Sequence, residues 1–190
     1  MPRSRFQIVV IGGSAGSMTA LSELLPVLPV DYPLPIVVVQ HLHPLQDDFH
    51  IEHLDSLCSL AVKEAEEKEL IRTGYIYMAP PNYHLLIEDD LTFSLSIDER
   101  VNYSRPSIDV LFESAVHAYG SQVVAVILTG ANNDGAQGIK QIKAQGGLAI
   151  VQDPQTADSP YMPKAALEAT QVDCVLSPRE IGRYLLTIIQ

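Results

Sequence analysis

Three residues that together could activate a serine nucleophile each follow a run of apolar residues in this sequence. They are Ser14, His41 and Asp134, which supply a hydroxyl, an imidazole and a carboxylate. Apolar, β-branched runs of this kind are typical of strands buried on both faces of a parallel sheet. Because ligand-binding and catalytic groups collect beyond the carboxyl ends of such strands, we expect the three side chains to meet. The sequence therefore predicts a serine hydrolase site.

Ser14 lies in a glycine-rich turn, Gly12-Gly-Ser-Ala-Gly16, which matches the pattern G-x-S-x-G. A sharp strand-to-helix turn of this type exposes the serine hydroxyl, and the glycines avoid crowding it. The amides that open the following helix are suited to binding an oxyanion. The same residues also fit an ordinary turn in which Ser14 or Ser17 only caps the next helix, and the turn alone does not decide between the two.

His41 opens a stretch that also suggests a metal site. His41 and His43 form an H-x-H pair with carboxylates at positions 47 and 48, and such residues can ligate zinc. The spacing H-x-H-x-D-H is absent, however, because Leu45 and Gln46 stand where Asp and His would be required. We therefore predict no metal. A surface loop with incidental histidines is the remaining alternative to a catalytic His41.

Asp134 lies in Asn132-Asn-Asp-Gly135, a sequence that is also typical of ordinary turns. Asp134 could simply cap the next helix. Its strand is among the most apolar in the chain, so it is expected beside the first strand at the centre of the sheet. A buried Asp at that position can hold an imidazole in the correct tautomer. His84 and His117 stand alone and are predicted to be structural.

The elements that must position these residues alternate between strands and helices, which predicts an α/β fold. We predict one domain over 1–190, a three-layer αβα arrangement around a doubly wound, mostly parallel sheet with an antiparallel strand extension in the middle of the chain. Ser104 is predicted to cap a helix with Pro106 in its first turn, and Asp47 or Asp48 to cap a helix that ends at Leu60. The predicted strands are 6–11, 36–40, 61–63, 74–79, 84–87, 91–97, 123–129, 148–152 and 174–176, and the remaining helices follow Ser17 and span 136–145, 162–170 and 178–189.

The charge balance excludes two classes of function. The 190 residues include 12 Lys and Arg against 23 Asp and Glu, a formal net charge of −11. Phosphate recognition needs clustered cations, so a nucleic-acid binder or an electrostatic membrane-surface protein is disfavoured. Only Cys58 and Cys174 are present, without a CxxC motif, and no apolar run is long enough for a membrane span. A cytoplasmic domain without a cofactor is expected.

Several blocks of the sequence, in order, resemble the catalytic domain of the chemotaxis receptor methylesterases, the CheB family. The resemblance spans Ile8 to about Leu186. The blocks that carry it are Ile11-Gly-Gly-Ser-Ala-Gly16, Val39-Gln-His41, Val62-Lys-Glu-Ala-Glu66, Tyr77-Met-Ala-Pro80 with His84-Leu85, Arg105-Pro-Ser-Ile-Asp-Val-Leu-Phe112, Val126-Ile-Leu-Thr-Gly130 with Asn133-Asp-Gly135, and Gln152-Asp-Pro154 with Met162-Pro163.

The resemblance implies Ser14 as nucleophile, His41 as general base and Asp134 as orienting carboxylate. The implied reaction is hydrolysis of glutamyl methyl esters on the cytoplasmic helices of methyl-accepting chemotaxis receptors, often with deamidation of glutamines. The backbone amides of Ala15 and Ala131 are implied oxyanion donors. Arg105, and also Arg72, are candidates for contact with the substrate helix or for ordinary surface ion pairs.

The sequence departs from the family pattern in two turns and at its start. Ala15-Gly16-Ser17 stands where Thr-Gly-Gly is usual, and Ala131-Asn132 where Met-Gly is common. Regulated members also carry a receiver domain in front, for which this sequence has no room. We therefore expect either a trimmed catalytic domain or a stand-alone esterase that a separate receiver-domain protein controls.

Two other functions compete with the esterase. A nucleotide- or phosphate-binding module could use the same turn, but Ser14 and Ser17 replace the glycines of G-x-G-x-x-G and no Walker lysine follows. A catalytically silent module of the same fold that binds receptor tails is the second alternative.

Overall fold

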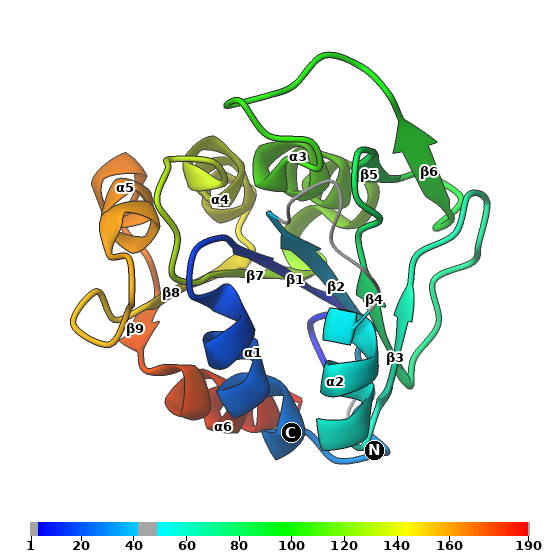
Figure 1. Ribbon diagram of the computed structural model, residues 1–190, viewed down its shortest axis with the longest axis horizontal. Helices are drawn as coiled ribbons and strands as arrows, with labels where there is room; N and C mark the ends of the chain where they lie inside the picture. The colour runs from blue at the N-terminus through cyan, green and yellow to red at the C-terminus, as the bar shows by residue number, and fades with distance from the viewer. Residues whose placement is uncertain (1–3, 42–48, 190) are drawn as a thin grey trace.

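The computed structural model describes residues 4–41 and 49–189, and in these ranges the chain forms a three-layer α/β fold (Figure 1). Its main sheet has seven parallel strands in the order β3-β4-β2-β1-β7-β8-β9. The strands are β1 Ile8–Gly13, β2 Ile36–Gln40, β3 Ala61–Glu64, β4 Tyr75–Met78, β7 Val123–Ile127, β8 Leu148–Gln152 and β9 Cys174–Leu176. The predicted parallel, doubly wound sheet is confirmed.

Helices cover both faces of this sheet, which explains why its central strands are apolar on both sides. The helices α1, α2 and α6 pack on one face and α3, α4 and α5 on the other (Figure 1). Their bounds are α1 Ser17–Leu24, α2 Phe49–Leu57, α3 Ile108–Tyr119, α4 Ala136–Ala144, α5 Tyr161–Ala169 and α6 Pro178–Thr187, with short 3-10 turns at Leu25–Val27 and Gly120–Gln122. All residues of β1, β2 and β7 are buried.

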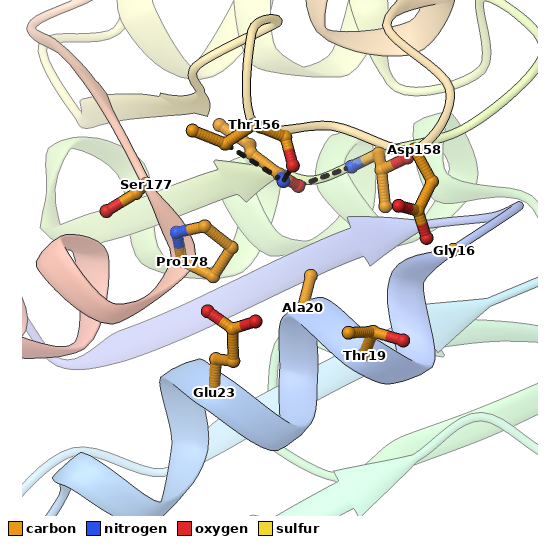
Figure 2. A pocket seen from close by; sticks show the side chains of 10 residues that line it. Gly16, Thr19, Ala20, Glu23, Thr156, Asp158, Ser177 and Pro178 are labelled. Carbon is orange, nitrogen blue, oxygen red and sulfur yellow. Dashed lines mark hydrogen bonds between the residues drawn. The ribbon is translucent and has the colours of Figure 1, made fainter.

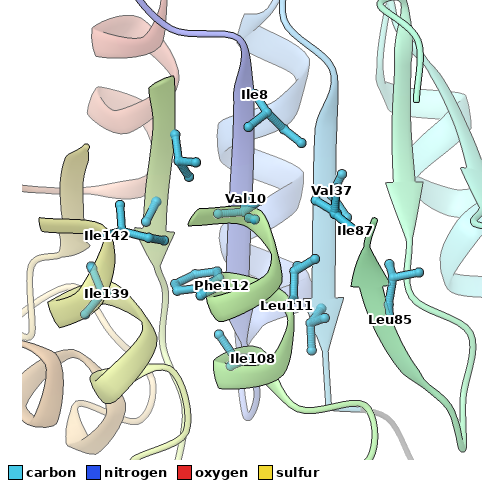
Figure 3. Packing of buried hydrophobic residues seen from close by; sticks show 14 of the residues in the cluster. Ile8, Val10, Val37, Leu85, Ile87, Ile108, Leu111, Phe112, Ile139 and Ile142 are labelled. Carbon is cyan, nitrogen blue, oxygen red and sulfur yellow. The ribbon is translucent and has the colours of Figure 1, made fainter. Parts of the chain in front are cut away.

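The antiparallel part of the fold is a separate hairpin and not an added edge of the main sheet. Strands β5 (His84–Ile87) and β6 (Phe93–Ser96) form their own two-stranded sheet, and Phe93 of β6 also exchanges backbone hydrogen bonds with Lys68 and Glu69 (2.8 and 2.9 Å). Leu85 and Ile87 pack toward α3, so the hairpin continues the helical layer on that face (Figure 3). The chain between β6 and α3 reaches the edge of the sheet where β2 and β7 end, because Ser104 lies 3.5 Å from both His41 and Asn132.

The start of α3 differs from the prediction. The N-cap is Ser107, whose hydroxyl accepts a bond from the backbone N–H of Val110, and not Ser104. With Ser104 as the cap, Arg105 would be the first helical residue, but the following Pro106 disfavours helical backbone at that position. The helix therefore begins after the proline.

The predicted caps Asp47 and Asp48 of the preceding helix lie outside the described residues, and α2 ends three residues earlier than predicted.

The core on the α3 face locks the first turn of α3 against the central strands. Ile108, Leu111 and Phe112 are fully buried against Val10 of β1 and Ile139 of α4 (Figure 3). Burying side chains of this size contributes about 2 kcal/mol each relative to exposure. The N-terminus of α3 is thereby fixed above the carboxyl ends of β1 and β7. No helix in the described ranges is long and apolar enough to span a bilayer.

Candidate active site

The turn that carries Ser14 is closed by backbone bonds on both sides. The N–H of Ser14 donates to the carbonyl of Thr129 after β7 (2.9 Å), and both the N–H and the hydroxyl of Ser17 donate to the Ser14 carbonyl (2.9 and 2.6 Å). Gly16 is the N-cap of α1 at φ +81°, a conformation that favours glycine. No side chain caps α1, so the interpretation of Ser14 or Ser17 as a mere cap is wrong.

Ser14 and His41 are brought to the same edge of the sheet by the pairing of β1 with β2. The N–H of His41 donates to the carbonyl of Gly13, the residue before Ser14 (3.1 Å). On its other side Ser14 meets the turn after β7, where a Cβ built on Gly130 would lie only 3.0 Å from the Ser14 Cβ. Within residues 4–41 and 49–189 the Ser14 hydroxyl has no hydrogen-bond partner, which leaves it available to a substrate.

His41 is held directly by Asp134. The Nε2 of His41 lies 2.8 Å from Oδ2 of Asp134, and the two side chains are 12% and 0% exposed. When Nε2–H donates to this carboxylate, the Nδ1 of the neutral ring carries the lone pair. Nδ1 is therefore the atom at which His41 can accept a proton.

Asp134 is a buried carboxylate saturated with hydrogen-bond donors. The alternative that it caps α4 is wrong, because the N-cap of that helix is Gly135 and no side chain bonds to it. The carboxylate lies instead at the N-terminus of α3, whose dipole favours negative charge. Oδ2 accepts from His41 and from the backbone N–H of Ile108 (2.6 Å), and Oδ1 accepts from Ser107 Oγ (2.8 Å), Asn102 Nδ2 (3.0 Å) and the backbone N–H of Asp109 (3.1 Å).

These donors keep Asp134 charged. Burial acts to raise the pKa of Asp134, but the bonds from His41, Asn102 and the two α3 amides together hold that pKa below its ordinary value. The neighbouring Asp109 shows the opposite result. Burial and the nearby charge of Asp134 raise the pKa of Asp109 above the ordinary value, against bonds from the Gly138 N–H (2.7 Å) and Asn102 Nδ2 (2.8 Å). Asn102 thus bridges two buried carboxylates.

Two further polar side chains face the other nitrogen of His41. Ser104 Oγ and Asn132 Nδ2 each lie 3.5 Å from His41 Nδ1 and 3.5 Å from each other. Neither was predicted at the site by sequence reasoning, nor were Asn102 and Ser107. Ser104 and Ser107 carried only a helix-cap signal, and no short-range pattern marks Asn102, which reaches Asp134 across 32 positions of sequence.

The amides proposed for an oxyanion lie where the two turns meet. Ala15 and Ala131 are both exposed, and neither backbone N–H donates to a carbonyl of the described residues. The turns are braced through Thr129, whose hydroxyl donates to the Ala15 carbonyl (2.8 Å) and whose N–H donates to Gln152 Oε1 (2.8 Å). Free amides on a braced backbone are suited to an oxyanion.

The contact of Arg105 and Arg72 with the substrate helix stays a prediction, and the structure shows where each arginine lies. Arg105 uses Nη1 to hold the carbonyls of Ile97 (2.8 Å) and Asp98 (3.0 Å) in the β6–α3 connection. Arg72 is exposed and precedes β4, which puts it at the opposite edge of the sheet from His41. Neither arginine forms a surface ion pair in the described residues, which was the alternative.

The prediction of a structural role is confirmed for His84, whereas His117 lies on the surface. His84 is buried and bridges the Glu99 carbonyl (2.9 Å) to the Ser107 N–H (3.1 Å). His117 is exposed on α3, 3.4 Å from Asp89.

In the described ranges no group of three His, Cys, Asp or Glu side chains could hold a metal. Because His43, Asp47 and Asp48 lie outside those ranges, the metal prediction stays untested.

A cavity of about 230 Å³ lies beside the start of α1 (Figure 2). Thr19 and Glu23 of α1 line one side, and Thr156 and Asp158 line the other. Asp158 approaches Gly16 so closely that a Cβ there would lie 2.5 Å from its Oδ2. Asp158 at the start of α1 and Glu23 in its last turn both place a carboxylate at this cavity and repel an anion, which argues against the nucleotide- or phosphate-binding alternative.

Comparison with known proteins places this architecture in one family. The family model of the CheB methylesterases matches residues 9–185. The chain belongs to the CheB methylesterase family. A crystal structure of the Thermotoga maritima CheB methylesterase catalytic domain superposes with a TM-score of 0.93 at 37% identity, covering 97% of this chain and 99% of that one.

Relatives in this family are named as hydrolytic enzymes. A Leptospira interrogans relative (strain Fiocruz L1-130) is 55% identical over 185 residues, covering 97% of this chain and 96% of its own, and is named provisionally as a protein-glutamate methylesterase/protein-glutamine glutaminase. An Archaeoglobus fulgidus protein with that name is 39% identical, and this chain spans 53% of its length. The alternative of a catalytically silent module gains no support from these relatives.

Proposed function

We propose that this CheB-family domain, spanning 1–190, is a serine hydrolase that removes methyl groups from glutamyl γ-methyl esters on the cytoplasmic helices of chemoreceptors. Ser14 is the nucleophile, His41 the general base and Asp134 the carboxylate that orients it. The observation that carries the proposal is the 2.8 Å bond from His41 Nε2 to Asp134 Oδ2 at the edge where Ser14 stands. The names of its relatives support the ester substrate.

In the first half of the reaction, Ser14 Oγ attacks the ester carbonyl carbon while its proton passes to His41 Nδ1. The amides of Ala15 and Ala131 bind the negative oxygen of the tetrahedral intermediate. His41 then returns the proton to the methoxy oxygen as the carbon–oxygen bond breaks. Methanol leaves, and the glutamyl group remains on Ser14.

In the second half, a water molecule gives its proton to His41 Nδ1 and its oxygen attacks the acyl carbon. His41 protonates Ser14 Oγ as the acyl bond breaks, and glutamate leaves. The sum is ester plus water giving glutamate and methanol. Throughout, Asp134 stays ionised and stabilises the imidazolium, because its hydrogen bonds keep its pKa low. Glutamine side chains would be deamidated by the same steps with ammonia leaving.

A fluorophosphonate probe and a methanol assay on methylated receptor helices test the proposal together. The probe should label Ser14, and Ser14→Ala should lose both labelling and methanol release without a change in melting temperature. Ser121→Ala, at an exposed hydroxyl before β7 at the opposite edge of the sheet, is the matched control and should retain both. Methanol release by Ser14→Ala at the native rate would refute the proposal.

A separate receiver-domain protein is the proposed regulator of the esterase. A change in the rate of methanol release when the receiver-domain protein is added tests that partner.

A further inference from the structure

Three polar atoms from separate elements form a nearly equilateral triangle beside the reactive nitrogen of His41. They are His41 Nδ1, Ser104 Oγ and Asn132 Nδ2, and each pair is 3.5 Å apart. A good hydrogen bond between such atoms is about 2.7–3.2 Å long, so the three are too far apart to satisfy one another well. His41 follows β2, Ser104 precedes α3 and Asn132 follows β7, so the backbone holds the spacing.

The triangle has the dimensions of a binding position for one oxygen atom. An oxygen about 2.8 Å from all three atoms would sit about 1.9 Å above their plane. At that position it would complete a hydrogen bond with each corner in place of three poor ones. The oxygen would also be in direct contact with the atom at which His41 exchanges protons.

The polarity of two corners, Asn132 and His41, is fixed by their other contacts. The side-chain oxygen of Asn132 accepts the backbone N–H of Asp134 (3.1 Å), which orients the amide so that Nδ2–H faces the triangle. His41 donates Nε2–H to Asp134, so its Nδ1 presents a lone pair or, after proton transfer, an N–H. Ser104 can donate or accept. The position therefore offers one obligatory donor, Asn132.

We propose that Ser104 and Asn132 bind the leaving-group oxygen of the substrate and then the hydrolytic water, and that Asn132 makes the site selective for esters over primary amides. The inference rests on the proposed function and deepens it. By microscopic reversibility the attacking water occupies the place that the methoxy group vacates, so one position serves both steps.

The selectivity follows from lone pairs. When the ester carbon–oxygen bond breaks, the methoxy oxygen takes the proton from His41 Nδ1 and still has lone pairs to accept the N–H of Asn132. When a glutamine carbon–nitrogen bond breaks, the nitrogen of the tetrahedral intermediate has used its one lone pair for the same proton, and the lone pair that ammonia takes from the broken bond points toward the acyl carbon. Toward the N–H of Asn132 the nitrogen therefore presents only N–H groups. That donor-to-donor contact disfavours the amide.

The test compares two receptor-derived peptides that differ only at one side chain, glutamyl γ-methyl ester against glutamine. For Asn132→Ala we expect kcat/KM on the ester to fall about tenfold, the value of one hydrogen bond to a charged group, with little change on the glutamine peptide. Ser104→Ala should lower kcat/KM on both peptides, because its hydroxyl can donate or accept. Asn132→Asp keeps an acceptor for the Asp134 N–H but loses the donor, so it should lower the ester-to-amide ratio as well. Gln137→Ala, an exposed amide on α4, is the control and should leave the ratio unchanged.

A p-nitrophenyl ester supplies a second readout that does not need the amide reaction. Its leaving group departs without help, so the burst of p-nitrophenol should keep its rate in Asn132→Ala while the steady-state rate, set by the attack of water, falls. In Asn132→Ala, equal losses on both peptides, or on burst and steady state, would mean a structural role only and would overturn the inference. Absence of Ser14-dependent turnover in the unmodified chain would instead overturn the proposed function.

Discussion

Asp134 holds His41 through Nε2, 2.8 Å from Oδ2, and this leaves Nδ1 as the nitrogen that faces Ser104 and Asn132. The direction of the ring matters, because it decides which atom carries the proton during catalysis. The carboxylate can impose this direction because it is itself fixed by the first two backbone amides of α3. The imidazole is thus oriented by a helix N-terminus acting through one carboxylate.

Replacing Asp134 by Asn should remove activity and weaken the fold. Five donors point at its two oxygens, so whichever way the new amide turns, its NH₂ meets a donor. We expect kcat to fall by about 10³- to 10⁴-fold because the His41 tautomer is no longer enforced. The free energy of unfolding should fall by about 2–4 kcal/mol. Methanol release and urea unfolding measure the two effects, and a stable, active variant would contradict the proposed role.

The contribution of Asp134 to stability should be confined to the pH range above about 4. Its pKa is lowered in the folded protein, and the unfolded value is about 3.9, so folding favours the ionised form. The stabilisation is therefore present above the unfolded pKa and is lost as the pH falls through the folded pKa. The difference in unfolding free energy between the native chain and Asp134→Asn should shrink as the pH falls below about 4. A difference that grows on acidification in that range would contradict this sign.

Asp109 should show the opposite dependence. Its pKa is raised in the folded protein, so its contribution is complete below the unfolded pKa and is lost as the pH rises through the folded pKa. Removing the charge at Asp134 removes one cause of that rise. In Asp134→Asn, the chemical shift of the Asp109 carboxyl carbon should therefore titrate at lower pH than in the native chain. Titration of Asp109 at an unchanged or higher pH would contradict the coupling.

The strands and the catalytic candidates could be predicted from sequence because their signals are local. The buried strands β1, β2 and β7 are continuous apolar runs, and the topology of a parallel sheet places the residues after each run at its carboxyl edge. Ser14, His41 and Asp134 were found in this way. Their roles remain a proposal, whereas the contact between His41 and Asp134 is a feature of the structure.

The surroundings of Asp134 could not be predicted because they depend on long-range contacts. Asn102 and Ser107 lie 32 and 27 positions away, and no periodicity reports that a helix N-terminus will be placed over the turn after β7. The prediction of Ser104 as a cap was wrong because both serines suit an N-cap and only the effect of Pro106 on the preceding residue separates them. The separate hairpin β5–β6 was likewise beyond local signals, since pairing partners are a tertiary property.

Ser107 and Ser104 should differ sharply when each is replaced by Ala. Ser107 is fully buried, donates to Asp134 Oδ1 (2.8 Å) and caps α3. Its loss should lower the free energy of unfolding by about 2–3 kcal/mol, the sum of a cap and a buried bond to a charge. Among the described residues the Ser104 hydroxyl makes only contacts of 3.4–3.5 Å, and its replacement, which keeps the backbone bonds to Val101, should change stability by less than about 0.5 kcal/mol. Equal effects in urea unfolding would contradict the assignment of the cap.

Arg105 should control how tightly the β6–α3 connection is held. Its guanidinium donates to the carbonyls of Ile97 and Asp98, and the same connection carries Arg100, which is exposed. In Arg105→Ala these carbonyls lose their partner, so we expect the segment to open more often and trypsin to cleave after Arg100 several-fold faster. Arg179→Ala, an exposed arginine on α6, is the matched control. Unchanged cleavage after Arg100, followed over time by mass spectrometry, would show that these two bonds do not restrain the segment. The substrate contact of Arg105 stays a separate prediction, and a higher KM for receptor peptides in Arg105→Ala would be the measurement that supports it.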